Sequence, residues 1–163
     1  MTNLSIIDDI RAIYQKSFAT VRAIVETFPE DKWLVPHSDE YYIPSRIAYH
    51  IATFISRHFA GGMNDPEFHA KLPYGYWMDA TSETLPNKRD FLVYYNAIIE
   101  KAEETLAALG EDTIHEPSDP ARAWIGESYI GILVYCLREI ADHTGELNKM
   151  LVENGFDDIF IFK

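Results

Sequence analysis

Four long segments of this chain carry apolar residues at three- and four-residue steps, and this periodicity limits the fold more than any other feature of the sequence. The segments run from about Ser5 to Phe28, Pro44 to Phe59, Lys88 to Leu109 and Glu127 to Glu153. Such steps place the apolar side chains on one face of an α-helix, so each helix has a face to bury. Four helices of this kind predict an all-α fold built as a four-helix bundle.

Residues that suit helix ends stand at the limits of these segments. Ser5 followed by Asp8 resembles a capping box at the start of the first helix, and Pro29 ends that helix. Asn87 can cap the start of the third helix, and Gly110 can cap its end. The end signals therefore agree with the helices that the periodicity predicts.

Two long connections join the helices. The first, from about Gly62 to Pro86, is rich in proline, tyrosine, tryptophan and histidine, and we expect a short helix near Pro66 to Lys71. A link of this length inside a compact domain is uncommon and often functional. The second runs from about Glu111 to Gly126, and the apolar tail from Ile159 to Phe162 predicts a strand-like arm that packs on the body or on a neighbouring molecule. With no interdomain linker in view, we expect residues 1–163 to form one domain.

The charge balance argues against two classes of partner. Fourteen basic and twenty-six acidic residues give a net charge of −12, and such a field repels nucleic-acid phosphates and anionic lipid surfaces. No apolar run approaches the ~20 residues that span a bilayer, and the segment from Met1 to Asp9 lacks the basic start of a signal peptide. The single cysteine, Cys136, excludes an intrachain disulfide. We therefore expect a cytoplasmic protein.

Two helices offer candidate metal ligands. On the last helix His143 falls within the apolar face, Glu139 stands one turn earlier, and Glu146 lies nearly one turn later at the same edge as Glu139. A histidine and a carboxylate four residues apart project to one side, which is a workable half of a metal site. On the second helix His50 lies at the margin of the apolar face and His58 lies nearer its centre, so the periodicity nominates either one. A lone histidine on such a face is more often a hydrogen-bonded core residue than a ligand.

The order of these features resembles that of the DinB-like superfamily. Trp33 and a proline-containing loop follow the first helix, the second helix reads IPSRIAYHI over residues 43–51, and the last reads LREIADHTGEL over residues 137–147. The superfamily includes bacterial thiol-transferases and proteins regarded as metal-dependent hydrolases. The resemblance covers essentially the whole chain, although its motifs are short. It implies a four-helix bundle of the DinB-like type with long crossover connections.

The resemblance also implies a ligand set. The family pattern places one histidine on the second helix and a His-x-x-x-His pair on the last, and His50 and His143 match its first and last histidines. The resemblance thus favours His50 over His58, which periodicity alone does not. Glu139 occupies the position where the family usually has the other histidine. Two histidines and one glutamate are a known zinc set that leaves a position for water.

Two functions follow from this resemblance. The first is a metal-dependent enzyme that holds zinc or nickel with His50, Glu139 and His143 and acts on an unidentified small molecule by thiol transfer or hydrolysis, with the aromatic segment from Leu72 to Met78 and Trp124 as walls of its pocket. The second is a metal-free protein, in which Glu139 marks loss of the metal, that binds a small ligand or is associated with stress. The resemblance also implies a homodimer.

Overall fold

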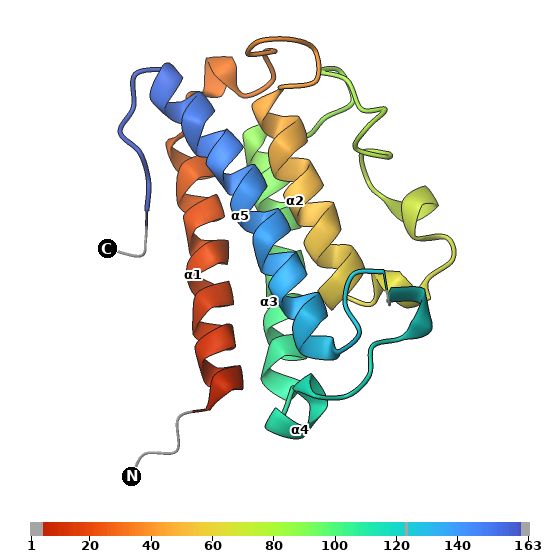
Figure 1. The fold of residues 1–163 in the computed structure, drawn as a ribbon. Coiled ribbons are helices and arrows are strands. Elements are labelled where there is room, and N and C mark those ends of the chain that lie inside the picture. The colour runs from red at the N-terminus through yellow and green to blue at the C-terminus, as the bar shows by residue number, and fades with distance from the viewer. Residues whose placement is uncertain (1–4, 123, 161–163) are drawn as a thin grey trace.

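The described part of the chain, residues 5–122 and 124–160 of a computed structural model, is helical (Figure 1). The long helices are α1 (Ile6–Thr27), α2 (Pro44–Phe59), α3 (Lys88–Ala108) and α5 (Tyr129–Glu153), and α4 (Glu111–Ile114) is one turn. Four 3₁₀ turns lie in the connections: Glu30–Lys32, Gly62–Asn64, Phe68–Lys71 and Pro120–Arg122. The described residues contain no β-strand, only an isolated bridge between Pro117 and Ser128. The all-α prediction is confirmed.

The starts of α1 and α3 follow the predicted caps, but the predicted cap at the end of α3 is wrong. That helix ends at Ala108 with Leu109 extended, and Gly110 is also extended, because it stands at the N-cap of α4, which follows directly. Ser5 accepts a hydrogen bond from the Asp8 amide at the start of α1, and Asn87 accepts one from the Asp90 amide at the start of α3. The last helix begins two residues later than its periodicity predicts. The cause is the bridge of Ser128 to Pro117, which keeps the backbone before Tyr129 extended and prevents an earlier helix start.

The four long helices lie side by side around a shared core (Figure 1). Helix α2 contacts α3 and α5, and helix α1 contacts the same two helices. Large aromatic side chains fill the interior, and their polar atoms find backbone partners: the Tyr14 hydroxyl donates to the Leu133 carbonyl at 2.7 Å, and the Tyr95 hydroxyl donates to the Phe18 carbonyl at 3.0 Å. Because buried polar groups are costly when unpaired, these bonds let tyrosine serve as a core residue.

The long connection between α2 and α3 is held against α2. The Tyr49 hydroxyl donates to the Gly75 carbonyl at 3.0 Å and accepts from the Tyr74 amide at 3.3 Å. Further along, the Ser45 hydroxyl donates to the Pro86 carbonyl at 2.7 Å. The short helix predicted near Pro66 to Lys71 is the 3₁₀ turn Phe68–Lys71. These anchors place the aromatic residues of the connection over the middle of α2.

The C-terminal arm packs on the body of its own chain. The Ile159 amide donates to Asn148 Oδ1 on α5 at 3.0 Å, and Asn148 Nδ2 donates back to the Ile159 carbonyl at 3.4 Å. The arm forms no strand over the residues described, and Ile161 and Phe162 of the predicted arm lie outside them. None of the described helices has a stretch that is long and apolar enough to cross a membrane.

Candidate metal centre

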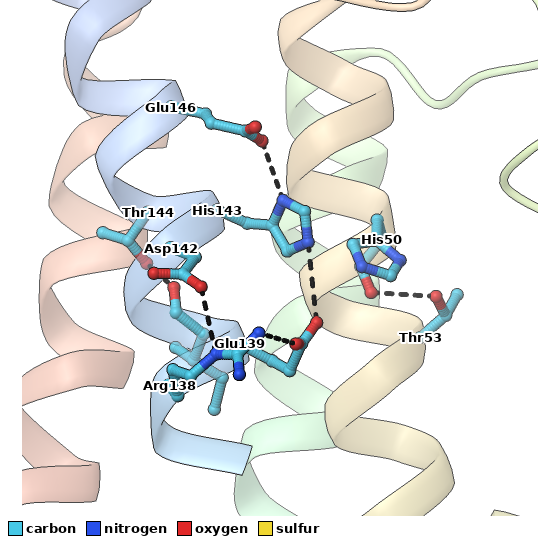
Figure 2. Close-up of polar contacts among 9 residues, drawn as sticks. His50, Thr53, Arg138, Glu139, Asp142, His143, Thr144 and Glu146 are labelled. Atoms are coloured by element: carbon cyan, nitrogen blue, oxygen red, sulfur yellow. Dashed lines mark hydrogen bonds and ion pairs between the residues drawn. The ribbon is translucent and has the colours of Figure 1, made fainter. Parts of the chain in front are cut away.

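The three residues nominated as metal ligands come together between α2 and α5. His50 projects from α2, while Glu139 and His143 project from α5, as Figure 2 shows. One ligand atom from each residue lies within 4.8 Å of the other two, and all three side chains are partly buried. The group could therefore hold a metal ion.

Helix geometry accounts for the pairing on α5. Glu139 and His143 are four residues apart, so they project to the same side, and His143 Nε2 lies 3.8 Å from Glu139 Oε2. Their side chains are only 19% and 18% exposed. His50 arrives from the neighbouring helix with its ring edge-to-face to that of His143, at a centroid distance of 4.4 Å. Packing of α2 against α5 thus completes a group that neither helix holds alone.

The separations of these atoms suit a small divalent ion. Zinc binds nitrogen and oxygen ligands at about 2.0–2.2 Å, and in a tetrahedral site the ligand atoms then stand about 3.4 Å apart. The 3.8 Å between His143 and Glu139 is close to that value, and the outer limit of 4.8 Å exceeds it by little more than one ångström. Small rotations of partly exposed side chains can close such a gap. The donor set and its spacing therefore fit the ion.

A fourth residue, Glu146, orients His143. Its Oε2 lies 2.7 Å from His143 Nδ1 (Figure 2), a charge-assisted hydrogen bond in which the imidazole donates. With the proton fixed on Nδ1, the lone pair is on Nε2, the nitrogen that faces Glu139. Metal-bound histidines nearly always donate their other ring nitrogen to such a partner. The three-residue spacing of His143 and Glu146 is the signal in the sequence that points to this contact.

His50 is held in its neutral form. Burial, and secondarily the neighbouring His143, lower the pKa of His50 to about 3. The Trp77 ring covers the imidazole at a centroid distance of 3.9 Å. The Nδ1 atom of His50 is buried and has no hydrogen-bond partner within the described residues. Because only a neutral imidazole can bind a metal, the surroundings of His50 favour ligation at neutral pH.

His58, the other histidine that periodicity nominates on α2, does not join this group. It lies two helical turns further along, with its ring 4.4 Å from the Phe54 ring. Burial, followed by the charges of Arg122 and Arg57, lowers the pKa of His58 to about 4. The potential metal ligands found together among the described residues include His50 and not His58.

Charged and aromatic neighbours frame the cluster. Arg138 lies 3.4 Å from Glu139 Oε1, but at 66% exposure this pair is weak. Burial, and then the charge of Glu139, raise the pKa of the Tyr135 hydroxyl. Of the aromatic residues expected to wall a pocket, Trp77 contacts His50, whereas Trp124 is 75% exposed and contacts Tyr135.

One pocket adjoins the cluster, and another adjoins its partner Glu146. One, of about 90 Å³, is lined by His50 together with Phe54, Arg57 and Trp77. The other, of about 330 Å³, is lined by Glu146 together with charged and polar residues, including His37, Lys149 and Glu153. A small molecule seated in either pocket would touch a residue of the cluster or its partner Glu146.

The chain matches no family model, no curated protein and no solved structure. The likeness to the DinB-like superfamily therefore depends on the short motifs and on the order of the helices. What the geometry adds is independent of that likeness: two imidazoles and one carboxylate, from two different helices, bring their ligand atoms within 4.8 Å of one another. Such nitrogen and oxygen donors suit both zinc and nickel.

Proposed function

We propose that this chain is a metal-dependent enzyme of the DinB-like type, a four-helix bundle with long crossover connections that holds zinc or nickel with His50, Glu139 and His143. The observation that carries the proposal is the convergence of these three ligand atoms within 4.8 Å of one another, although His50 and Glu139 lie far apart in the sequence. The reaction is thiol transfer to, or hydrolysis of, a small molecule.

The chemistry follows from the ligand set. A divalent ion, when bound, acts as a Lewis acid that lowers the pKa of a water or thiol and so supplies a nucleophile. Three protein ligands leave one coordination position of the ion open for that water or thiol. Glu146 keeps the His143 proton on Nδ1, Glu139 contributes a negative charge, and Trp77 packs against the His50 ring.

Metal content tests this function directly. Protein purified without a histidine tag or chelators would be assayed by elemental mass spectrometry, beside His50→Ala, Glu139→Ala and His143→Ala. We expect near-stoichiometric zinc or nickel in the wild type and its loss in all three variants. His58→Ala is the matched control, because it removes a histidine from the same helix outside the cluster. Wild-type protein that takes up neither ion when both are supplied contradicts the proposal.

A second candidate, a metal-free dimeric bundle that binds a ligand, is supported by a different surface. An apolar groove of about 320 Å³ lies between α1 and α5 and contains none of the cluster residues. Its lining includes Ile13, Leu137 and Phe160, and the first and last of these are 42% and 52% exposed. An exposed apolar face of this kind suits a symmetric contact with a second copy. Analytical ultracentrifugation of wild type and Ile13→Glu distinguishes this reading: a dimer that the variant dissociates supports it.

A further inference from the structure

Arg46 is a buried cation with no anionic partner among the residues that the structure describes. Only 8% of the residue is exposed. Its Nη2 donates a hydrogen bond to the Ala80 carbonyl, and the Tyr41 ring lies 5.7 Å away. Its Nε is buried and unpaired, and no carboxylate forms an ion pair with it among the described residues. Burying an unpaired charge is costly, and an anion that reaches it relieves that cost.

A pocket opens beside this arginine. It measures about 330 Å³ and lies where the start of α2 meets the long connection between α2 and α3. Ile43 and Pro36 give it an apolar side, and Thr81 and Ser82 bring hydroxyl groups to the other. Arg46 Nη1 has no hydrogen-bond partner among the described residues and, unlike Nε, is not fully buried. The pocket therefore offers a guanidinium nitrogen, hydroxyl donors and room for more than a single oxyanion.

We propose that this pocket binds a small molecule bearing one oxyanion, a carboxylate or a phosphate, with the anion paired to Arg46 and the remainder against Ile43 and Pro36. A guanidinium matches the geometry of both anions. The site is separate from the metal cluster, because none of the three metal ligands lines it, and the inference does not depend on the proposed function.

Two carboxylates at the rim limit the charge of the ligand. Glu40 and Glu83 also line the pocket, and both are exposed and solvated. They repel a multiply charged ligand more than a singly charged one. They also offer an alternative explanation of how the buried charge of Arg46 is tolerated, namely that one of the two carboxylates turns inward and neutralises it.

Nuclear magnetic resonance of the full-length chain tests the site. Sodium acetate and inorganic phosphate would be titrated separately at constant ionic strength, so that the two arms distinguish carboxylate from phosphate. We expect saturable amide shifts at residues 43–46 and 80–83 with at least one of them. Arg46→Lys should weaken binding at least tenfold, because an ammonium cannot reproduce the planar fork of the guanidinium. Shifts that are absent, unsaturable or centred on residues 139–146 would overturn the proposal.

Two variants at the rim separate the proposal from the alternative without altering Arg46. Ser82→Leu places a larger side chain in the pocket from the long connection between α2 and α3. It should abolish anion binding while the circular dichroism spectrum stays unchanged. Glu83→Gln should tighten binding severalfold without lowering the free energy of unfolding, since it removes a like charge. A Glu83→Gln variant that loses stability instead identifies Glu83 as the partner of Arg46, and the pocket is then no anion site.

Discussion

At the scale of single residues, the candidate centre depends on which nitrogen of His143 carries the proton. Glu146 decides this through its 2.7 Å contact with Nδ1, and the sequence alone places Glu146 only at the edge of the same helix face. The hydrogen bond arises because residues three apart on a helix are neighbours. It leaves Nε2 as the nitrogen for the ion.

Glu146→Gln should therefore weaken zinc binding without removing a ligand. Glutamine can still accept the hydrogen bond, but its neutral amide makes the imidazole less basic, and changes at such partners typically cost about 10–100-fold in metal affinity. Competition against a chromophoric chelator measures the dissociation constant. Asp142→Asn is the matched control, since it removes the same charge from α5 and the Asp142 carboxylate pairs with the exposed Arg138. Equal affinities in the two variants would show that Glu146 does not orient His143.

His58 predicts a pH dependence of stability. Its pKa is lowered to about 4 in the folded state, whereas in the unfolded chain it is about 6.5. The unfolded state therefore takes up the proton first, and the free energy of unfolding falls as the pH drops from about 6.5 to about 4, by of the order of 3 kcal/mol at most. Below that range the loss stops.

His58→Phe removes this contribution while keeping an aromatic ring against Phe54. Urea denaturation at pH 7, 6, 5 and 4 should show a smaller loss of stability for the variant than for the wild type. The remaining slope belongs to other groups, His50 among them, whose pKa is also lowered. Replacement of the exposed His115 by phenylalanine is the control, and it should leave the pH dependence of the free energy of unfolding as it is in the wild type. Parallel curves for wild type and His58→Phe would rule the effect out.

At the scale of elements, the helices could be predicted because apolar periodicity and capping residues act locally. The parts that could not be predicted depend on distant contacts. Helix α4 is one turn long, too short for a periodic signal, and its Glu111 accepts hydrogen bonds from Ser5 and the Ile7 amide at the far end of the chain. The late start of α5 likewise depends on a bridge to Pro117.

The long connection between α2 and α3 behaves as a separate element, and the Tyr49 hydroxyl anchors it at Tyr74 and Gly75. Tyr49→Phe removes one donor and one acceptor and should release residues 72–78, with a cost of about 1–2 kcal/mol. Hydrogen exchange should accelerate there and change little in α1 and α5. Tyr95→Phe is the control, because its hydroxyl bonds the Phe18 carbonyl inside the core. The proposed anchoring fails if exchange in the connection is the same in both variants.

At the scale of the whole molecule, the choice between His50 and His58 shows where sequence reasoning ends. A helical projection gives the face on which a residue lies but not its level along the axis relative to another helix. The two histidines are eight residues apart, about two turns, and only the packing of α2 against α5 puts His50 level with His143. The motif resemblance selected His50, and the geometry supports that selection on separate grounds.

An ion held by both α2 and α5 must also stabilise the fold as a whole. A ligand that binds only the folded state adds about 2.7 kcal/mol when its concentration is 100 times its dissociation constant. For a domain of this size each kcal/mol raises the melting temperature by roughly 2–4 °C, so saturating zinc should raise it by about 5–11 °C. Magnesium should not, because it prefers an all-oxygen shell.

Differential scanning calorimetry of wild type, His50→Ala and His143→Ala, each with and without zinc, measures this coupling. His50→Ala removes the cluster ligand on α2, and His143→Ala removes one of the two cluster ligands on α5, so each should abolish the zinc-dependent rise. His58→Ala should retain it, since that residue lies outside the group. If either ligand variant keeps the full rise, zinc binds elsewhere on the molecule, and α2 and α5 are not joined through the cluster. If both ligand variants lose the rise in melting temperature, one ion bridges α2 and α5 through ligands that lie far apart in the chain.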